Sequence, residues 1–119
     1  MATELWWLAT CEYWTWRVRP VDADGTAIDP TGMAVEFAAV ALDTPPGASW
    51  AAILAQAEGS ATGSWAGPDD GGYYTARVLL SGTGGGGDIE VPAGTWSMLA
   101  RITATPELPV ETTGVVVMR

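Results

Sequence analysis

Residues 11–19 read Cys-Glu-Tyr-Trp-Thr-Trp-Arg-Val-Arg, and this stretch decides the fold class. Its side chains alternate between two sides: Trp14, Trp16 and Val18 on one, and Tyr13, Thr15, Arg17 and Arg19 on the other. Because successive side chains of a β-strand point to opposite faces, the pattern predicts a strand with one buried face. Pro20 ends the strand, since proline has no backbone N–H to donate.

Further strand-like segments follow at intervals of about 8–12 residues, separated by turn-forming residues such as Asp24-Gly25. They cover residues 33–42, 61–66, 73–80, 89–91, 95–103 and 110–118. We therefore expect one domain over residues 1–119, an antiparallel β-sandwich or small barrel of seven to nine short strands. Its architecture is Ig-like without the disulfide, because Cys11 is the single cysteine. Cys11 lies among apolar and aromatic residues, so we expect a buried, unreactive thiol.

Two segments are ambiguous. The alanine-rich residues 50–58 have the composition of a short helix, but they lie among short strands, and we favour a strand with the helix as the alternative. Residues 81–88 are rich in glycine, and we expect a flexible loop or hairpin.

The charge balance limits the partners. The chain has 14 acidic and five basic residues, no histidine and no lysine, and its net charge is −9. A strongly acidic surface repels nucleic acid phosphates and anionic membranes, whereas it suits a basic protein surface. No apolar run reaches the roughly 18 residues of a membrane span, and residues 1–8 lack the basic region of a signal peptide. We expect a soluble protein made in the cytosol.

The chain lacks the residues that most kinds of enzymatic catalysis require. Without histidine there is no Ser-His-Asp triad and no ordinary zinc site, and without lysine there is no Schiff base. Nothing in the spacing of the acidic residues favours a glycosidase pair. We therefore expect no catalytic residue and no enzyme.

Two short motifs resemble ligand sites. Residues 82–87 match G-x-G-x-x-G, but the acidic, proline-containing segment 88–92 follows where a nucleotide site requires a helix. Residues 22–25, Asp-Ala-Asp-Gly, resemble the start of a calcium loop, yet Met33 stands where the closing glutamate belongs. We expect no cofactor and no metal ligand, and we interpret these segments as a loop and an acidic turn.

Seven tryptophans form the strongest signal. Trp14, Trp16 and Trp96 fall on inward strand positions and are expected in the core. The others lie on less regular segments and are candidate interface residues, because aromatic side chains are enriched at protein interfaces; these are Trp6, Trp7, Trp50 and Trp65. Residues 1–10 are the corresponding candidate for an interface arm, with carbohydrate stacking as the competing use of an exposed tryptophan.

Residues 105–110, Thr-Pro-Glu-Leu-Pro-Val, form a stiff acidic corner. Pro106 and Pro109 fix φ and remove two donors, so the segment cannot pair as a central strand. We expect it to carry the chain between the two sheets with Glu107 outward. Pro106, Glu107 and Pro109 complete the candidate interface residues, as a rigid edge that a neighbouring subunit could grip.

The last two predicted strands resemble a pattern in small β-sandwich structural proteins of tailed bacteriophages. Residues 93–118 carry a glycine, an aromatic residue, alternating apolar residues, the proline-bracketed corner and a valine-rich final strand; the matching positions are Gly94, Trp96, Arg101, Ile102, Pro106, Glu107, Pro109, Val110 and Gly114. Residues 29–40, DPTGMAVEFAAV, are similar to a strand of the same phage modules, and residues 63–80 match more weakly. The resemblance covers most of the chain after residue 28.

This resemblance implies a virion component without catalysis. It implies a location in the head-to-tail connector (neck) of the virion, with capsid decoration or an accessory tail or baseplate module as alternatives. Partners would be the portal, connector, capsid or tail proteins, in a ring or lattice of identical copies. The alternative from another class is a β-sandwich module that binds carbohydrate or a host surface.

Overall fold

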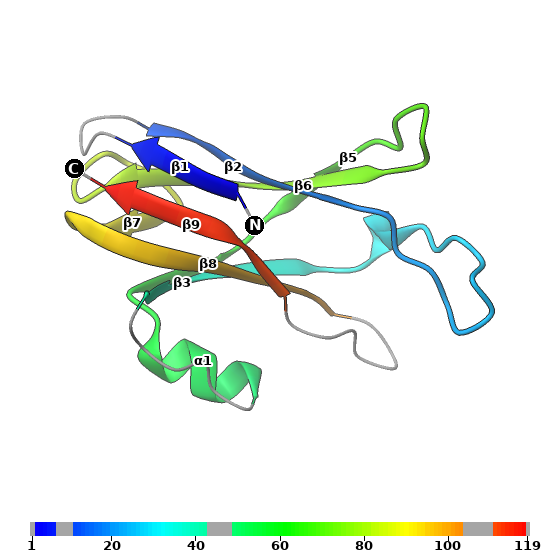
Figure 1. Cartoon of the computed structure of the whole chain (residues 1–119), viewed down its shortest axis with the longest axis horizontal. Coiled ribbons are helices and arrows are strands. Elements are labelled where there is room, and N and C mark those ends of the chain that lie inside the picture. Colours follow the sequence, from blue (N-terminus) through cyan, green and yellow to red (C-terminus); the bar gives the residue numbers. More distant parts are fainter. Residues whose placement is uncertain (1, 7–10, 43–48, 104–110, 119) are drawn as a thin grey trace.

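The computed structural model describes residues 2–6, 11–42, 49–103 and 111–118, and these form two β-sheets that face each other (Figure 1). Sheet A has the strand order β1-β9-β8-β3-β4. Sheet B has the order β2-β6-β5, and β7 pairs in parallel with the end of β6. The predicted all-β sandwich is confirmed.

The strands of sheet A are β1 (Ala2–Trp6), β3 (Val35–Ala41), β4 (Gly59–Thr62), β8 (Gly94–Ile102) and β9 (Glu111–Met118). Those of sheet B are β2 (Cys11–Val18), β5 (Ser64–Ala66), β6 (Tyr74–Gly82) and β7 (Ile89–Val91). A 3-10 turn, η1 (Pro30–Gly32), and one helix, α1 (Trp50–Gln56), interrupt them. The orders β3-β8-β9 and β2-β6-β5 are those of the C-F-G and B-E-D strands of an immunoglobulin sandwich.

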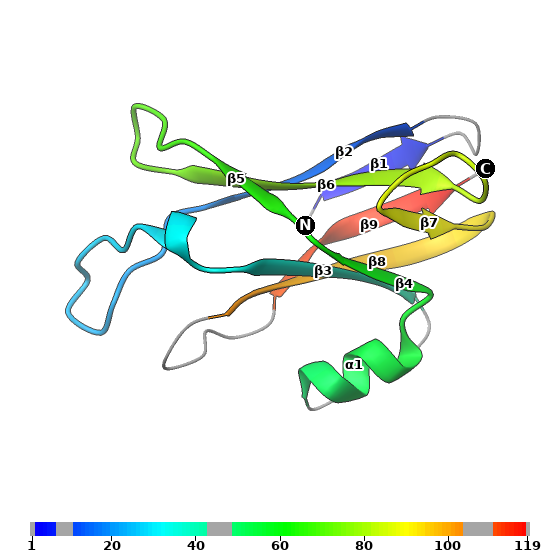
Figure 2. The same cartoon turned by 180° about the vertical axis from the view of Figure 1, so that it is seen from behind.

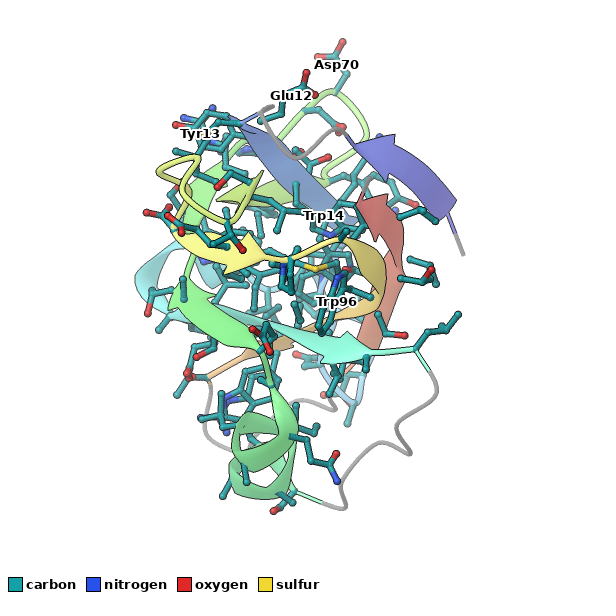
Figure 3. All side chains as sticks on the ribbon, turned by 90° about the vertical axis from the view of Figure 1, so that its left-hand side faces the viewer. Glu12, Tyr13, Trp14, Asp70 and Trp96 are labelled. Atoms are coloured by element: carbon teal, nitrogen blue, oxygen red, sulfur yellow. The ribbon has the colours of Figure 1, made fainter. Side chains whose placement is uncertain are left out.

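The core lies between the sheets, where the alternation of β2 and β8 predicted it. Trp14 points inward while Tyr13, its neighbour on β2, points away from the sandwich (Figure 3). The indole nitrogen of Trp14 donates a hydrogen bond of 2.9 Å to Thr113 Oγ1, which links β2 to β9 of the opposite sheet. The hydrophobic core comprises Trp14, Val35, Phe37, Ala39, Ala76, Val78, Leu80, Ile89, Val91, Met98, Ala100 and Val116.

The prediction of a strand over residues 50–58 was wrong, because this segment begins with α1. Ser49 caps the helix by accepting a hydrogen bond of 3.2 Å from the Ala52 amide. Trp50 and Ile53, three residues apart, pack against the outer face of sheet A, where Ala38 and Val40 give β3 a second apolar face. Local helix propensity therefore agreed with the tertiary packing, and the spacing of neighbouring strands was misleading.

The predicted strand at residues 61–66 is divided between the two sheets. β4 pairs with β3 in sheet A, and β5 pairs with β6 in sheet B. The chain passes directly from β4 into β5 (Figure 2). Gly63 lies between the two strands, and its amide donates a hydrogen bond of 2.8 Å to the Val35 carbonyl. A Cβ on Gly63 would lie 2.6 Å from the Phe37 ring, so only glycine allows the chain to cross between sheets here.

The glycine-rich segment joins β6 to a parallel strand, so it is a crossover rather than a hairpin. Its amides have partners within the chain: Gly84 and Gly86 donate hydrogen bonds to the Glu90 carboxylate at 3.0 and 3.2 Å. The Gly87 amide donates one of 2.9 Å to Ser81 Oγ, which is buried. Glu90 therefore occupies the position that an anion would take on these amides.

The expectation for Cys11 was wrong, since its side chain is exposed. Cys11 lies three positions before the inward-pointing Trp14 on β2, so the alternation of the strand places it on the same outward face as Tyr13.

Candidate functional site

The outer face of sheet B carries the most distinctive group of exposed side chains. The alternation of β2 places Tyr13 and Arg17 on this face, and Arg77 of β6 lies opposite Thr15 between them. Helix α1 lies against the other sheet, so it does not cover this face (Figure 1). We call this surface the Arg/Tyr face, defined by Tyr13, Arg17, Arg19, Tyr73 and Arg77.

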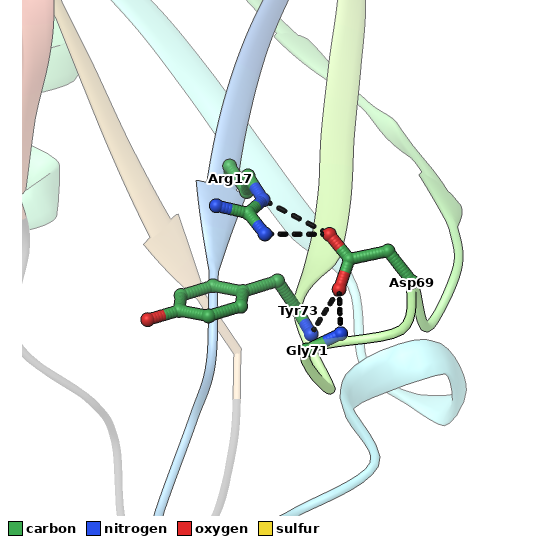
Figure 4. Close-up of polar contacts among 4 residues, drawn as sticks. All are labelled: Arg17, Asp69, Gly71 and Tyr73. Carbon is green, nitrogen blue, oxygen red and sulfur yellow. Dashed lines mark hydrogen bonds and ion pairs between the residues drawn. The ribbon is translucent and has the colours of Figure 1, made fainter.

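Arg17 is held in place by two groups from the β5–β6 connection (Figure 4). Its Nε and Nη2 donate hydrogen bonds of 3.0 and 2.7 Å to Asp69 Oδ2. The other carboxylate oxygen, Oδ1, accepts from the backbone amides of Gly71 and Tyr73 at 2.8 and 3.0 Å. The guanidinium also stacks over the Tyr73 ring, 4.0 Å from its centre.

These donors keep Asp69 ionised. The hydrogen bond from Arg17, followed by the one from the Tyr73 amide, lowers the pKa of Asp69 below its ordinary value. The Arg17 and Asp69 side chains are 58% and 43% exposed, so solvent screens the pair and it adds little to stability. Its effect is to fix the orientation of the Arg17 side chain.

A second pair forms where β2 and β6 meet. The Arg77 guanidinium lies 4.6 Å from the centre of the Tyr13 ring, and Tyr13 is 52% exposed. Within the described part of the chain, the two ion pairs are Arg17–Asp69 and Arg101–Glu36, so neither Arg19 nor Arg77 has a carboxylate partner there. The three arginines of the Arg/Tyr face and Asp69, which contacts Arg17, together carry a net charge of +2.

Another polar group, on sheet A, has a structural role. The Glu36 carboxylate accepts hydrogen bonds from Arg101 Nη2 at 3.0 Å, Thr103 Oγ1 at 3.2 Å and the Trp50 indole at 3.2 Å. Burial acts to raise the pKa of Glu36, but these donors, Arg101 first, outweigh it and lower the pKa below the ordinary value. The group ties the start of α1 to strands β3 and β8.

Two of the candidate interface tryptophans, Trp50 and Trp65, pack within the chain. Trp50 is only 6% exposed, and its indole is committed to Glu36 and Arg101. Trp65 is half-buried, donates a hydrogen bond of 2.9 Å to the Met33 carbonyl and meets Tyr74 edge-on. Both side chains are used in packing within the chain.

The other candidates are not brought together by the structure. Trp6 belongs to β1, which pairs in parallel with β9, and its backbone lies opposite Met118. Trp7, Pro106, Glu107 and Pro109 lie outside the described residues.

Sequence reasoning missed the Arg/Tyr face as a site, although part of the signal was present. The alternation over residues 11–19 already placed Tyr13 and Arg17 on one outward face. Arg77 and Tyr73 join them only through the pairing of β2 with β6 and through the turn that carries Asp69.

The acidic turn after β2 is closed by its own hydrogen bonds. Asp22 Oδ1 accepts from the amides of Asp24 and Thr26, each at 2.9 Å. Across residues 2–6, 11–42, 49–103 and 111–118, no three Asp, Glu or Cys side chains group closely enough to hold a metal ion. In the same residues, no helix is both long and apolar enough to cross a membrane.

Comparison with known proteins adds no identification: no family model, no curated protein and no solved structure matches this chain.

Proposed function

We propose that this chain is a non-enzymatic structural component of a tailed-phage virion, in the head-to-tail connector, and that it assembles through protein–protein contacts on the Arg/Tyr face. The phage assignment rests on the resemblance of residues 93–118 and 29–40 to phage β-sandwich proteins. The contact surface rests on one observation, the ordered arginine–tyrosine pairs on an uncovered sheet face.

Arginine and tyrosine are suited to this role. Both are enriched among residues that dominate binding energy, because they combine a large contact area with hydrogen-bonding groups. Fixing a long side chain on binding costs about 0.5–1.5 kcal/mol, and the stacking on Tyr73 and the Asp69 contacts reduce this cost for Arg17 in advance. The face is therefore preorganised for a partner.

The tryptophans favour this function over carbohydrate binding. A sugar-binding platform needs an exposed aromatic face, but the tryptophan side chains that the structure describes are buried or half-buried; they are Trp14, Trp16, Trp50, Trp65 and Trp96. The described tryptophans therefore do not form such a platform.

The proposal is tested by mass spectrometry of purified virions from the phage that encodes the chain. We expect the protein in the particle at a copy number set by the symmetry of the connector ring. A copy number that matches the capsid symmetry would identify the protein as a capsid decoration protein instead. Absence from virions would refute the proposal.

The role of the Arg/Tyr face is tested by the same measurement on variants. Tyr13→Ala should reduce incorporation, because it removes an exposed ring and the surface on which Arg77 stacks. Leu54→Ala is the matched control, since Leu54 is also an exposed large apolar residue, 39% exposed on α1, and lies on the other side of the sandwich. Equal incorporation of both variants would show that this face is not the contact surface.

A further inference from the structure

We propose that the Arg/Tyr face binds the acidic hairpin of a second copy of this chain, head to tail. The acidic hairpin comprises residues 20–28, between β2 and η1. This inference deepens the proposed function, because it uses the same face and names the partner surface.

The charge distribution of the chain supports a second copy as the occupant. The three arginines of the Arg/Tyr face and Asp69 together carry +2 while the whole chain has −9, so all other charged residues together carry −9 − 2 = −11. Two identical faces placed against each other would bring six arginines together, which like-charge repulsion opposes. A favourable contact between copies that uses this face must therefore join it to a different, acidic surface.

The acidic hairpin has the properties of such a surface. It contains Asp22 and Asp24 and no basic residue, and Asp29 follows it directly. Val21, next to these acids, is 47% exposed, one of four exposed large hydrophobic side chains among the residues that the structure describes. The Arg/Tyr face has the complementary arrangement, because the exposed Tyr13 ring lies beside the positive charge of Arg77. Val21 could therefore contact Tyr13 while the acids contact the arginines.

The hairpin is also ordered before binding. The Asp22 amide donates to the Thr26 carbonyl at 2.9 Å, and Val21 and Ala27 form an antiparallel bridge. Gly25 takes a φ of 79°, which closes the turn. An ordered hairpin loses little conformational entropy when it docks.

The direction of the hairpin makes the contact intermolecular. It begins just after β2 ends and projects beyond the sheets at the right-hand end of Figure 1. It therefore points away from the Arg/Tyr face of its own chain. A repeated contact between two different surfaces gives a closed ring when its rotation closes, which is the assembly that a connector needs.

Charge exchange tests the contact in the purified full chain. Sedimentation velocity between about 10 µM and about 1 mM, at about 0.05 M salt, should show an average mass that rises with concentration. We expect Arg77→Glu and Asp24→Arg each to raise the dissociation constant about tenfold, and the double variant to return it to within about threefold of the wild-type value. The double variant keeps the net charge of −9, since the two changes cancel.

Glu58→Arg is the matched control. Glu58 is exposed and lies before β4, outside the hairpin, and its reversal changes the net charge to −7 as Asp24→Arg does. General repulsion between copies falls equally in both variants, so weaker association of Asp24→Arg alone identifies the hairpin. Circular dichroism in the near ultraviolet should show the wild-type fold in all four variants.

Two outcomes would overturn the inference: a wild-type chain that stays monomeric over the whole concentration range, or a double variant that associates no better than the single ones. Neither outcome touches the virion assignment, which mass spectrometry of particles decides. A chain that assembles as expected but is absent from virions would refute the proposed function and leave the contact standing.

Discussion

The glycine that carries the chain from one sheet to the other should be the most sensitive position for a small substitution. In Gly63→Ala the new methyl group would lie 2.6 Å from Cε2 of Phe37 and 2.7 Å from the Arg77 carbonyl oxygen. Ordinary contact begins at 3.4 Å, so the Phe37 contact needs a displacement of 3.4 − 2.6 = 0.8 Å. Phe37 is fully buried, and the Arg77 backbone belongs to the pairing of β5 with β6.

The magnitude follows from the crowding of a packed core. Forcing extra atoms into such a core costs about 1–3 kcal/mol, and two close contacts on immobile groups indicate about 3 kcal/mol. For a chain of 119 residues this lowers the midpoint of thermal unfolding by about 12 °C. Thermal unfolding followed by tryptophan fluorescence measures it, because Trp14 and Trp65 pack on the same core.

Gly32→Ala is the control for this experiment. A Cβ at Gly32 meets nothing within 4 Å, so its midpoint should lie within about 2 °C of the wild-type value. If Gly63→Ala unfolds within about 2 °C of Gly32→Ala, the crossing at Gly63 is not sterically restricted and the reasoning fails.

Three further substitutions test the polar contacts. Glu36→Gln should cost about 1–2 kcal/mol at neutral pH, because the ion pair between Arg101 and the Glu36 carboxylate is lost. Because the pKa of Glu36 is lowered in the folded state, its ionised carboxylate stabilises the fold at pH values above the unfolded-state pKa. This stabilisation is lost as the pH falls through the folded-state pKa. The free energy of unfolding in urea should therefore fall more steeply in acid for the wild type than for Glu36→Gln. Trp14→Phe should cost about 1–3 kcal/mol in urea unfolding, because Thr113 loses its donor across the sandwich, and an unchanged midpoint would contradict that role. Arg17→Ala should change stability by less than about 0.5 kcal/mol, since its ion pair is exposed, and a larger loss in the same assay would assign the Arg/Tyr face a structural role.

The sequence determined the fold class because strand alternation and turn residues act locally. Residues 11–19 placed Trp14 and Trp16 inward and Arg17 outward, and the structure agrees. The missing disulfide and the missing histidine are likewise properties of composition, which no fold can change.

Sequence patterns gave unclear or wrong predictions where a segment packs on both of its faces or passes from one sheet to the other. β3 is buried on both faces, so its alanines gave no clear period, and the apolar surface that receives α1 could not be recognised from the sequence. Residues 61–66 looked like one strand because the change of sheet at Gly63 depends on Phe37, which is 26 positions away.

The candidate site shows the same division. The sequence by itself determined which side chains of β2 face outward, through the two-residue period of an extended chain. Only the tertiary structure decided that Arg77 and Tyr73 lie beside them, because strand pairing brings together residues about 60 positions apart. The register of β2 on β6 sets which side chains stack, and no local property of either strand encodes that register.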